Sequence, residues 1–192
     1  MTQNKILTPF YYLAGAKTLI IGILFLAITT LLSYFSFCRF DGLIDIHFSK
    51  PIYFPFTRFL LDQIIGWLLT CIFFCLGFLF CGAGRWPRAI DLLGTTIFAR
   101  IPLVIAPLMA FIFPNLIPTN VTPSNLLNID FGKILMLALI SIVGTILHII
   151  LLYNAYKVCF NLTGTKLKLS FILIIVLGEI LTKIPIIYQL LF

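Results

Sequence analysis

Long uncharged stretches alternate with short polar segments along this chain. Residues 18–38 and residues 64–84 each form a run of 21 residues without a charged side chain. A helix of that length measures about 30 Å, which matches the hydrocarbon core of a bilayer. The pattern predicts two membrane-spanning helices in the first half of the chain.

Three further apolar stretches follow, at residues 93–113, 134–156 and 169–190. The first of them contains Arg100 together with Pro102 and Pro107, and we expect the prolines to bend that helix. The sequence therefore predicts an all-α membrane protein, a bundle of five transmembrane helices in a single domain over residues 1–192.

The distribution of Lys and Arg predicts the orientation of the bundle. With the N-terminus in the cytoplasm, eight basic residues fall on the cytoplasmic side and four on the other side. Cytoplasmic loops carry the excess of Lys and Arg in membrane proteins. We expect a cytoplasmic N-terminus and a C-terminus on the opposite side. The eight are Lys5, Lys17, Arg85, Arg88, Arg100, Lys157, Lys166 and Lys168; the four are Arg39, Lys50, Arg58 and Lys133.

Composition supports a membrane location. Hydrophobic residues make up 61% of the chain and charged residues only 10%, against about 25% in an ordinary soluble domain. The net charge of +7 is spread between apolar runs and forms no nucleic-acid patch. The lipid bilayer is thus the expected partner. The five cysteines have no framework spacing and no further ligands beside them, so we expect no metal and no cofactor.

The fifth predicted span carries two charges. Twelve Leu, Ile, Val and Phe residues in 171–187 favour insertion by roughly 4–7 kcal/mol, and each central charge costs about 2.5–3.5 kcal/mol. Glu179 and Lys183 are four residues apart, the favourable spacing for a helical ion pair. They form either a self-neutralising structural pair or a functional site, because ionisable residues inside membranes are often functional.

Helical spacing places Ser141, Thr145 and His148 on one face of the fourth span. His148 lies about 13 Å along the axis from Lys157, a depth similar to that of Glu179 in the fifth span. We therefore expect an intramembrane polar cluster, formed by Arg100, His148, Glu179 and Lys183. The alternative is that Arg100 and Lys183 snorkel to opposite interfaces while His148 bonds a backbone carbonyl.

The connections carry smaller signals. Residues 43–48 alternate loosely, which predicts a short strand or an extended loop with His47 as a solvated residue. Arg58 and Asp62, one helical turn apart, are expected to form a boundary ion pair. Gly164 is expected to adopt the left-handed conformation that closes the fourth helix. The candidate contacts with anionic lipid headgroups are Arg85, Trp86, Arg88, Lys166 and Lys168.

Several short motifs resemble bacterial members of the YIP family of five-span integral membrane proteins, related to Ypt/Rab-interacting proteins. They are Tyr153-Asn-Ala-Tyr-Lys157, Asn161-Leu-Thr-Gly-Thr-Lys166, Ser170-Phe-Ile, Gly178-Glu179, and Leu93-Gly-Thr-Thr leading to Ala99-Arg-Ile-Pro102. The resemblance implies a multi-pass protein of the inner (plasma) membrane without an established activity. Only 17 residues precede the first span, so the Rab-binding role of the eukaryotic relatives is not transferred.

No catalytic constellation is recognisable in the sequence, so we predict that the protein is not an enzyme. We predict a membrane-organising or partner-binding protein that contacts itself or other membrane proteins. The alternative is a small transporter or lipid-handling protein that uses the polar cluster around Glu179. A wide polar cleft reaching Glu179 would favour the alternative, whereas a dry, tightly packed bundle would favour the first function.

Overall fold

A computed structural model describes residues 8–48, 54–81, 85–116 and 131–184. Its α-helices are α1 (Ala16–Ser36), α2 (Phe56–Cys81), α3 (Ala89–Ala99), α4 (Ile105–Ile112), α5 (Phe131–Phe160) and α6 (Gly164–Thr182). Three 3-10 turns accompany them: η1 (Pro9–Tyr11), η2 (Ile101–Val104) and η3 (Pro114–Leu116). Two short strands, β1 (Cys38–Arg39) and β2 (His47–Phe48), pair antiparallel.

Within the described residues, four helices are long and apolar enough to cross a membrane. They are α1, α2, the α3–η2–α4 stretch over Ala89–Ile112, and α5. The fifth predicted span corresponds to α6, which is a helix of 19 residues but carries Lys166, Lys168 and Glu179. The predicted helical fold is therefore confirmed, with four apolar spans. Residues 82–84 and 185–190 of the predicted spans lie outside the described residues.

The helix α1 shows the inverted polarity that is typical of membrane helices. Its buried positions are Thr18, Gly22, Thr29, Thr30, Ser33 and Ser36, whereas large residues such as Ile20, Leu24 and Phe35 are exposed. The buried hydroxyls of Thr29 and Thr30 donate to carbonyl oxygens one turn back, at 2.7 and 2.8 Å. Small residues let helices approach closely when the surrounding solvent is lipid.

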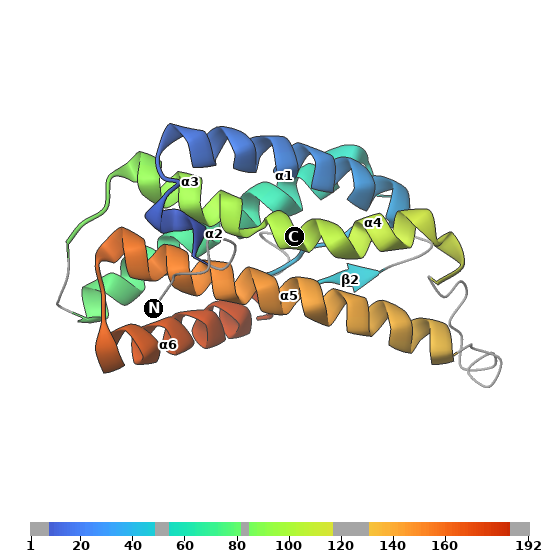
Figure 1. Ribbon diagram of the computed structural model, residues 1–192. Coiled ribbons are helices and arrows are strands. Elements are labelled where there is room, and N and C mark those ends of the chain that lie inside the picture. The colour runs from blue at the N-terminus through green and yellow to red at the C-terminus, as the bar shows by residue number, and fades with distance from the viewer. Residues whose placement is uncertain (1–7, 49–53, 82–84, 117–130, 185–192) are drawn as a thin grey trace.

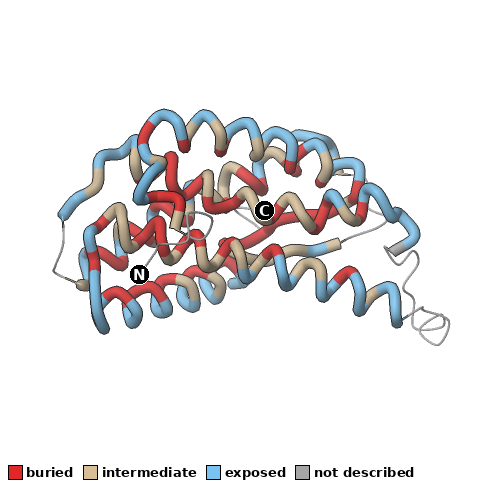
Figure 2. The backbone as a smooth tube through the Cα atoms, viewed as in Figure 1, coloured by how far each residue is buried: buried red, intermediate tan, exposed pale blue. Residues whose placement is uncertain are grey.

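The helices pack as a bundle with buried residues on their inner sides (Figures 1 and 2). Helix α1 packs on α3 and α4, α2 on α6, and α5 on α3, η2 and α4. An aromatic cluster joins α2, α5 and α6, with Phe74 and Tyr156 ring centroids 4.9 Å apart and those of Phe78 and Phe160 5.0 Å apart. These contacts fix the end of the bundle at which α5 turns into α6.

The third apolar stretch is bent at the predicted place. Helix α3 ends at Ala99, and Pro102 lies in the first turn of η2, where its missing N–H breaks no helical hydrogen bond. Pro107 lies in the first turn of α4, where a backbone N–H would also have no partner within the helix. The bend expected from the two prolines is thus confirmed, and it leaves Arg100 at the junction.

The segment 38–48, which we call the inner hairpin, folds into the bundle. Cys38, Phe40, Asp41 and Leu43 are each at most 3% exposed, so residues 38–43 are buried between the helices, whereas residues 44–48 are partly or fully exposed (Figure 2). At 1.5 Å per residue, the 30 residues of α5 extend about 45 Å and the 19 residues of α6 only about 28 Å. The described part of α6 ends near the middle of the bundle, where it meets this hairpin (Figure 1).

Gly164 has the predicted positive φ, but the residue that closes α5 is Asn161, so the predicted closing role of Gly164 is wrong. Asn161 has φ +51°, and the N–H of Leu162 donates to the Lys157 carbonyl at 3.1 Å. This is a Schellman arrangement, in which Asn is the usual substitute for Gly. Gly164 also has a positive φ, +68°, but it is the first residue of α6.

Replacing Asn161 tests this turn. We expect Asn161→Val to lower the free energy of unfolding by about 1–2 kcal/mol, because a β-branched residue is strained in the left-handed region. Asn161→Gly should be neutral or stabilising. Thermal unfolding in detergent measures both. The neighbouring exposed Thr163 makes no side-chain cap, so Thr163→Val is the control, and equal losses in both valine variants would contradict the assignment.

Candidate functional site

The inner hairpin lies among the four residues of the predicted polar cluster. The Ile44 N–H donates to Glu179 Oε1 at 2.6 Å, and His148 Nε2 lies 3.3 Å from the Leu43 carbonyl oxygen. Lys183 Nζ lies 2.6 Å from Asp45 Oδ2 and 3.3 Å from Asp41 Oδ1. Three of the four residues thus contact this one segment.

His148 is fully buried between two carbonyl oxygens. Its Nδ1 donates to the Ala99 carbonyl at 2.7 Å, while the second nitrogen faces the Leu43 carbonyl. A neutral imidazole has one N–H, and the shorter contact places it on Nδ1. The predicted alternative, that this histidine bonds a backbone carbonyl, therefore describes its geometry.

Arg100 remains inside the bundle and does not snorkel to the interface. It is 5% exposed, and its Nη2 donates to Gln63 Oε1 at 3.4 Å. The guanidinium lies against Gly66, where an added Cβ would be 3.2 and 3.3 Å from its two terminal nitrogens. The same Cβ would be 2.9 Å from the Gly42 carbonyl oxygen, so the hairpin backbone, Gly66 and Arg100 meet at one point.

Glu179 and Lys183 do not act as the self-neutralising helical pair that their spacing favoured. The carboxylates that Lys183 contacts are those of Asp41 and Asp45. The predicted cluster is consequently divided in two by the hairpin backbone. Arg100 and His148 lie with Ala99 beside Gly42 and Leu43. Glu179 and Lys183 contact Ile44 and the carboxylates of Asp41 and Asp45, which we call the acidic bend of the hairpin.

His47 pairs with the same two acids. Its Nε2 lies 3.0 Å from Asp41 Oδ1 and 3.1 Å from Asp45 Oδ2. Hydrogen bonds to these carboxylates raise the pKa of His47 from 6.5 to about 9, and the histidine in turn lowers the pKa of Asp45 below its ordinary value. The predicted solvent exposure of His47 is confirmed, since its side chain is half exposed, but the prediction missed its two ion pairs.

A second set of ion pairs anchors the base of the hairpin. Arg39 Nε donates to Asp62 Oδ2 at 2.8 Å, with the carboxylate 1% exposed. Arg58 lies 3.5 Å from the other oxygen of the same carboxylate, which confirms the predicted boundary pair. One carboxylate of α2 therefore ties together β1 and the first turn of its own helix.

The only group in the described part of the chain with metal-ligand geometry is Asp41, Asp45 and His47, whose ligand atoms lie within 4.8 Å of one another. Two features oppose a metal there. A ligating histidine must be neutral, whereas this one holds its proton up to about pH 9. The Lys183 ammonium already supplies positive charge to both carboxylates.

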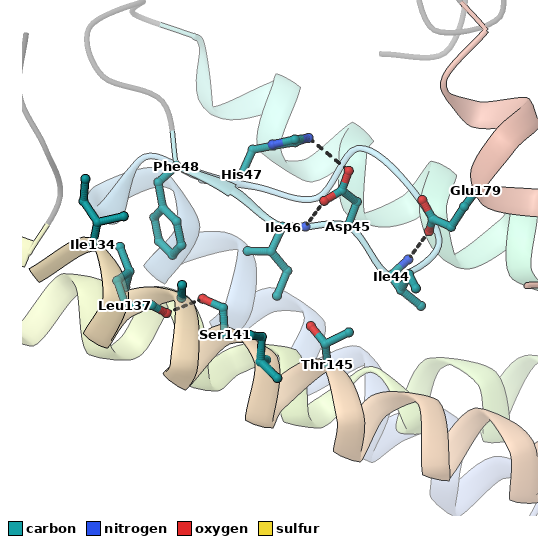
Figure 3. A pocket seen from close by; sticks show the side chains of 12 residues that line it. Ile44, Asp45, Ile46, His47, Phe48, Ile134, Leu137, Ser141, Thr145 and Glu179 are labelled. Atoms are coloured by element: carbon teal, nitrogen blue, oxygen red, sulfur yellow. Dashed lines mark hydrogen bonds and ion pairs between the residues drawn. The ribbon is translucent and has the colours of Figure 1, made fainter. Parts of the chain in front are cut away.

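A pocket of about 610 Å³ opens between the inner hairpin and α5. Figure 3 shows Ser141 and Thr145 projecting from α5 toward the hairpin, with Glu179 of α6 beside Ile44 at the far end of the hairpin. The predicted shared face of α5 is therefore confirmed, since its two hydroxyls line the pocket and His148 continues inward. The lining residues are Ile44, Asp45, Ile46, His47, Phe48, Ile134, Leu137, Ala138, Ser141, Ile142, Thr145 and Glu179.

The five candidate headgroup residues are all exposed and lie at one end of the bundle, near the α2–α3 and α5–α6 connections (Figure 1). Trp86 is 57% exposed and packs edge-on against Phe78 at 4.8 Å. Arg88 forms a two-point ion pair with Asp91, at 2.6 and 3.0 Å, so part of its charge is already neutralised. Arg85, Lys166 and Lys168 carry the remaining positive charge.

The sequence-based reasoning missed Asp41 and Asp45. A signal was present, because the chain has only six acidic residues and Lys183 needs a counter-charge inside an apolar helix. The two aspartates of one short connection were candidates for that role. Nothing in the sequence indicated that their connection folds inward.

The four apolar helices, the inverted polarity of α1 and the buried ion pairs define a helical membrane protein. Comparison with protein-family models, with curated proteins and with solved structures finds no match. Membership of the YIP family therefore stays a prediction that rests on the motifs in the sequence.

Stability should depend on pH through His47. Its pKa is raised on folding, so its contribution is complete below pH 6.5 and is lost as the pH rises through 9. We expect the stability difference between wild type and His47→Gln to shrink over that range in thermal unfolding. Arg58→Gln, which removes a charge that does not titrate there, should give a constant difference. A constant difference for His47→Gln would contradict the ion-pair geometry.

Enlarging Gly66 should displace the hairpin from the bundle. In Gly66→Val the new side chain would meet the Gly42 carbonyl and the Arg100 guanidinium, and overpacking of this kind costs about 1–3 kcal/mol. We expect lower thermal stability and faster protease cleavage within residues 38–48. The control is Ala27→Val on the exposed side of α1. Unchanged stability and cleavage would show that the hairpin and Gly66 are not in close contact.

Proposed function

We propose that this protein binds an amphipathic small molecule or lipid in the pocket between the inner hairpin and α5. The observation that carries the proposal is the pocket itself, about 610 Å³ in volume and reaching Glu179. Ligand pockets commonly measure about 300–1,000 Å³ and combine apolar walls with a few polar groups. A cleft reaching Glu179 favours the lipid-handling or transport alternative over a purely organising role.

The lining supports an amphiphile in particular. Ile134, Leu137, Ala138 and Ile142 form an apolar wall along α5, and Ser141 and Thr145 add hydroxyls. At the hairpin side the pocket meets the carboxylates of Asp45 and Glu179. A ligand with an apolar chain and a hydrogen-bond-donating head matches this division.

The charges favour a cationic head, such as a primary amine. Asp45 is neutralised by His47 and Lys183. The Glu179 carboxylate accepts backbone hydrogen bonds from the hairpin, from the Ile44 N–H to Oε1 at 2.6 Å and from Leu43. A carboxylate has about four lone-pair sites, so it can accept a further donor. An ammonium group donating to this carboxylate would form a charge-assisted hydrogen bond.

The proposed setting is a five-span protein of the inner membrane with a cytoplasmic N-terminus. The exposed basic residues Arg85, Lys166 and Lys168 at one end of the bundle support this orientation, because cytoplasmic faces are rich in Lys and Arg. The pocket then lies in the half of the bundle away from the cytoplasm. Contacts of those basic residues with anionic headgroups would hold the protein at a fixed depth.

Native mass spectrometry of the detergent-solubilised protein tests the proposal. Titration with phosphatidylethanolamine and, separately, with phosphatidylglycerol should show preferential retention of the amine-bearing lipid. Glu179→Gln should weaken that retention about tenfold, the loss expected for one charge-assisted hydrogen bond of about 1.4 kcal/mol. Ala138→Trp, which fills the pocket, should remove retention of both lipids.

Asp91→Asn is the matched control, because it removes a carboxylate at the opposite end of the bundle, and it should leave retention unchanged. Equal retention of the two lipids by wild type would exclude the amine preference. Unchanged retention in Ala138→Trp would place lipid binding elsewhere and overturn the proposed function.

A further inference from the structure

A second, much smaller cavity lies between α1, α2 and the α3–η2 junction. Its volume is about 10 Å³, enough for one water-sized species. Three polar side chains, Thr29, Gln63 and Arg100, reach it from three different elements. The remaining lining residues are Phe25, Leu26, Ile97 and Ile101.

The cavity is surrounded by hydrogen-bond donors that lack acceptors. Arg100 Nε, Arg100 Nη1 and Gln63 Nε2 are buried and have no hydrogen-bond partner among the described residues. Arg100 is 5% exposed and Gln63 is 2% exposed, so bulk water does not satisfy these groups. Buried polar groups without partners are rare, because each has lost its hydrogen bonds to water and gained none in return.

The cavity also carries a positive charge that is only partly compensated. Arginine stays protonated in proteins, and the ion pairs described for this chain do not include Arg100. Glu179 attracts the guanidinium from a distance, but its carboxylate contacts the hairpin backbone at Gly42 and Ile44. A buried charge without a partner costs several kcal/mol, so a counter-ion in this cavity would stabilise the fold.

We infer that this cavity binds a small monovalent anion of the halide class, held by the Arg100 guanidinium and the Gln63 amide. A halide accepts N–H groups from both side chains and supplies the negative charge that no ion pair provides. A water molecule leaves the charge in place and brings two hydrogens that need acceptors of their own. The volume is about that of one water molecule, so it excludes phosphate or a carboxylic acid, and a halide enters as the lining side chains relax around it. This inference is independent of the amphiphile pocket and goes beyond the proposed function.

Thermal unfolding in sodium chloride and in sodium gluconate at equal ionic strength tests the inference. We expect chloride to raise the melting temperature of wild type in a saturable way. At ten times the dissociation constant, binding lowers the ratio of unfolded to folded protein about 11-fold. Arg100→Gln should abolish the chloride effect. Gln63→Met, which keeps the arginine, should shift its half-saturation to a several-fold higher concentration.

Arg58→Gln is the matched control, since Arg58 pairs with Asp62 outside the cavity, and it should keep the full chloride response. Crystals grown in sodium bromide should show an anomalous peak between Arg100 and Gln63. A wild-type melting temperature that is the same in both salts would overturn the inference. So would a chloride response that persists in both cavity variants, or the absence of the bromide peak. If Arg100→Gln does not fold, the Gln63→Met titration and the bromide peak decide the question.

Discussion

The arrangement of this bundle depends on supplying hydrogen-bond partners to the backbone of the inner hairpin. Non-helical backbone inside a membrane protein must find hydrogen-bond partners within the protein, because lipid offers none. The Ile44 N–H meets this requirement through Glu179, and the Ala99 carbonyl at the end of α3 does so through His148 Nδ1. Two polar residues that are costly in apolar helices therefore have a structural reason to be there.

The ionisable side chains follow from the same arrangement. Asp62 holds the base of the hairpin through Arg39, and the acidic bend at Asp41 and Asp45 is neutralised by His47 and Lys183. Removing either partner of such a pair leaves an uncompensated charge. The ion pairs are thus coupled to the inward fold of one short segment. Arg100 differs from the others because none of the described ion pairs includes it, although Glu179 attracts it from a distance.

The same hairpin accounts for the pocket. The short helix α6 ends where the hairpin begins, and the loop stands away from α5 along the face that carries Ser141 and Thr145. If α6 were as long as α5, it would cover the face of α5 that carries Ser141 and Thr145. Instead, one wall of the pocket is an apolar helix and the other is a loop with carboxylates. This asymmetry gives the site its amphipathic character.

The sequence by itself determined the helices, because an uncharged run long enough to cross a bilayer is a local property of the chain. It also determined the bend near Pro102 and the polar face of α5, since both follow from the covalent structure of proline and from helical periodicity. It misplaced helix ends where charges are paired: α2 begins at Phe56 and not at residue 64, because Asp62 is neutralised by Arg58 and Arg39.

Only the tertiary structure decided that residues 38–48 enter the bundle, that Lys183 pairs with Asp41 and Asp45, and that Arg100 faces Gln63. These contacts join residues far apart in the chain, and their energy depends on burial that no local pattern contains.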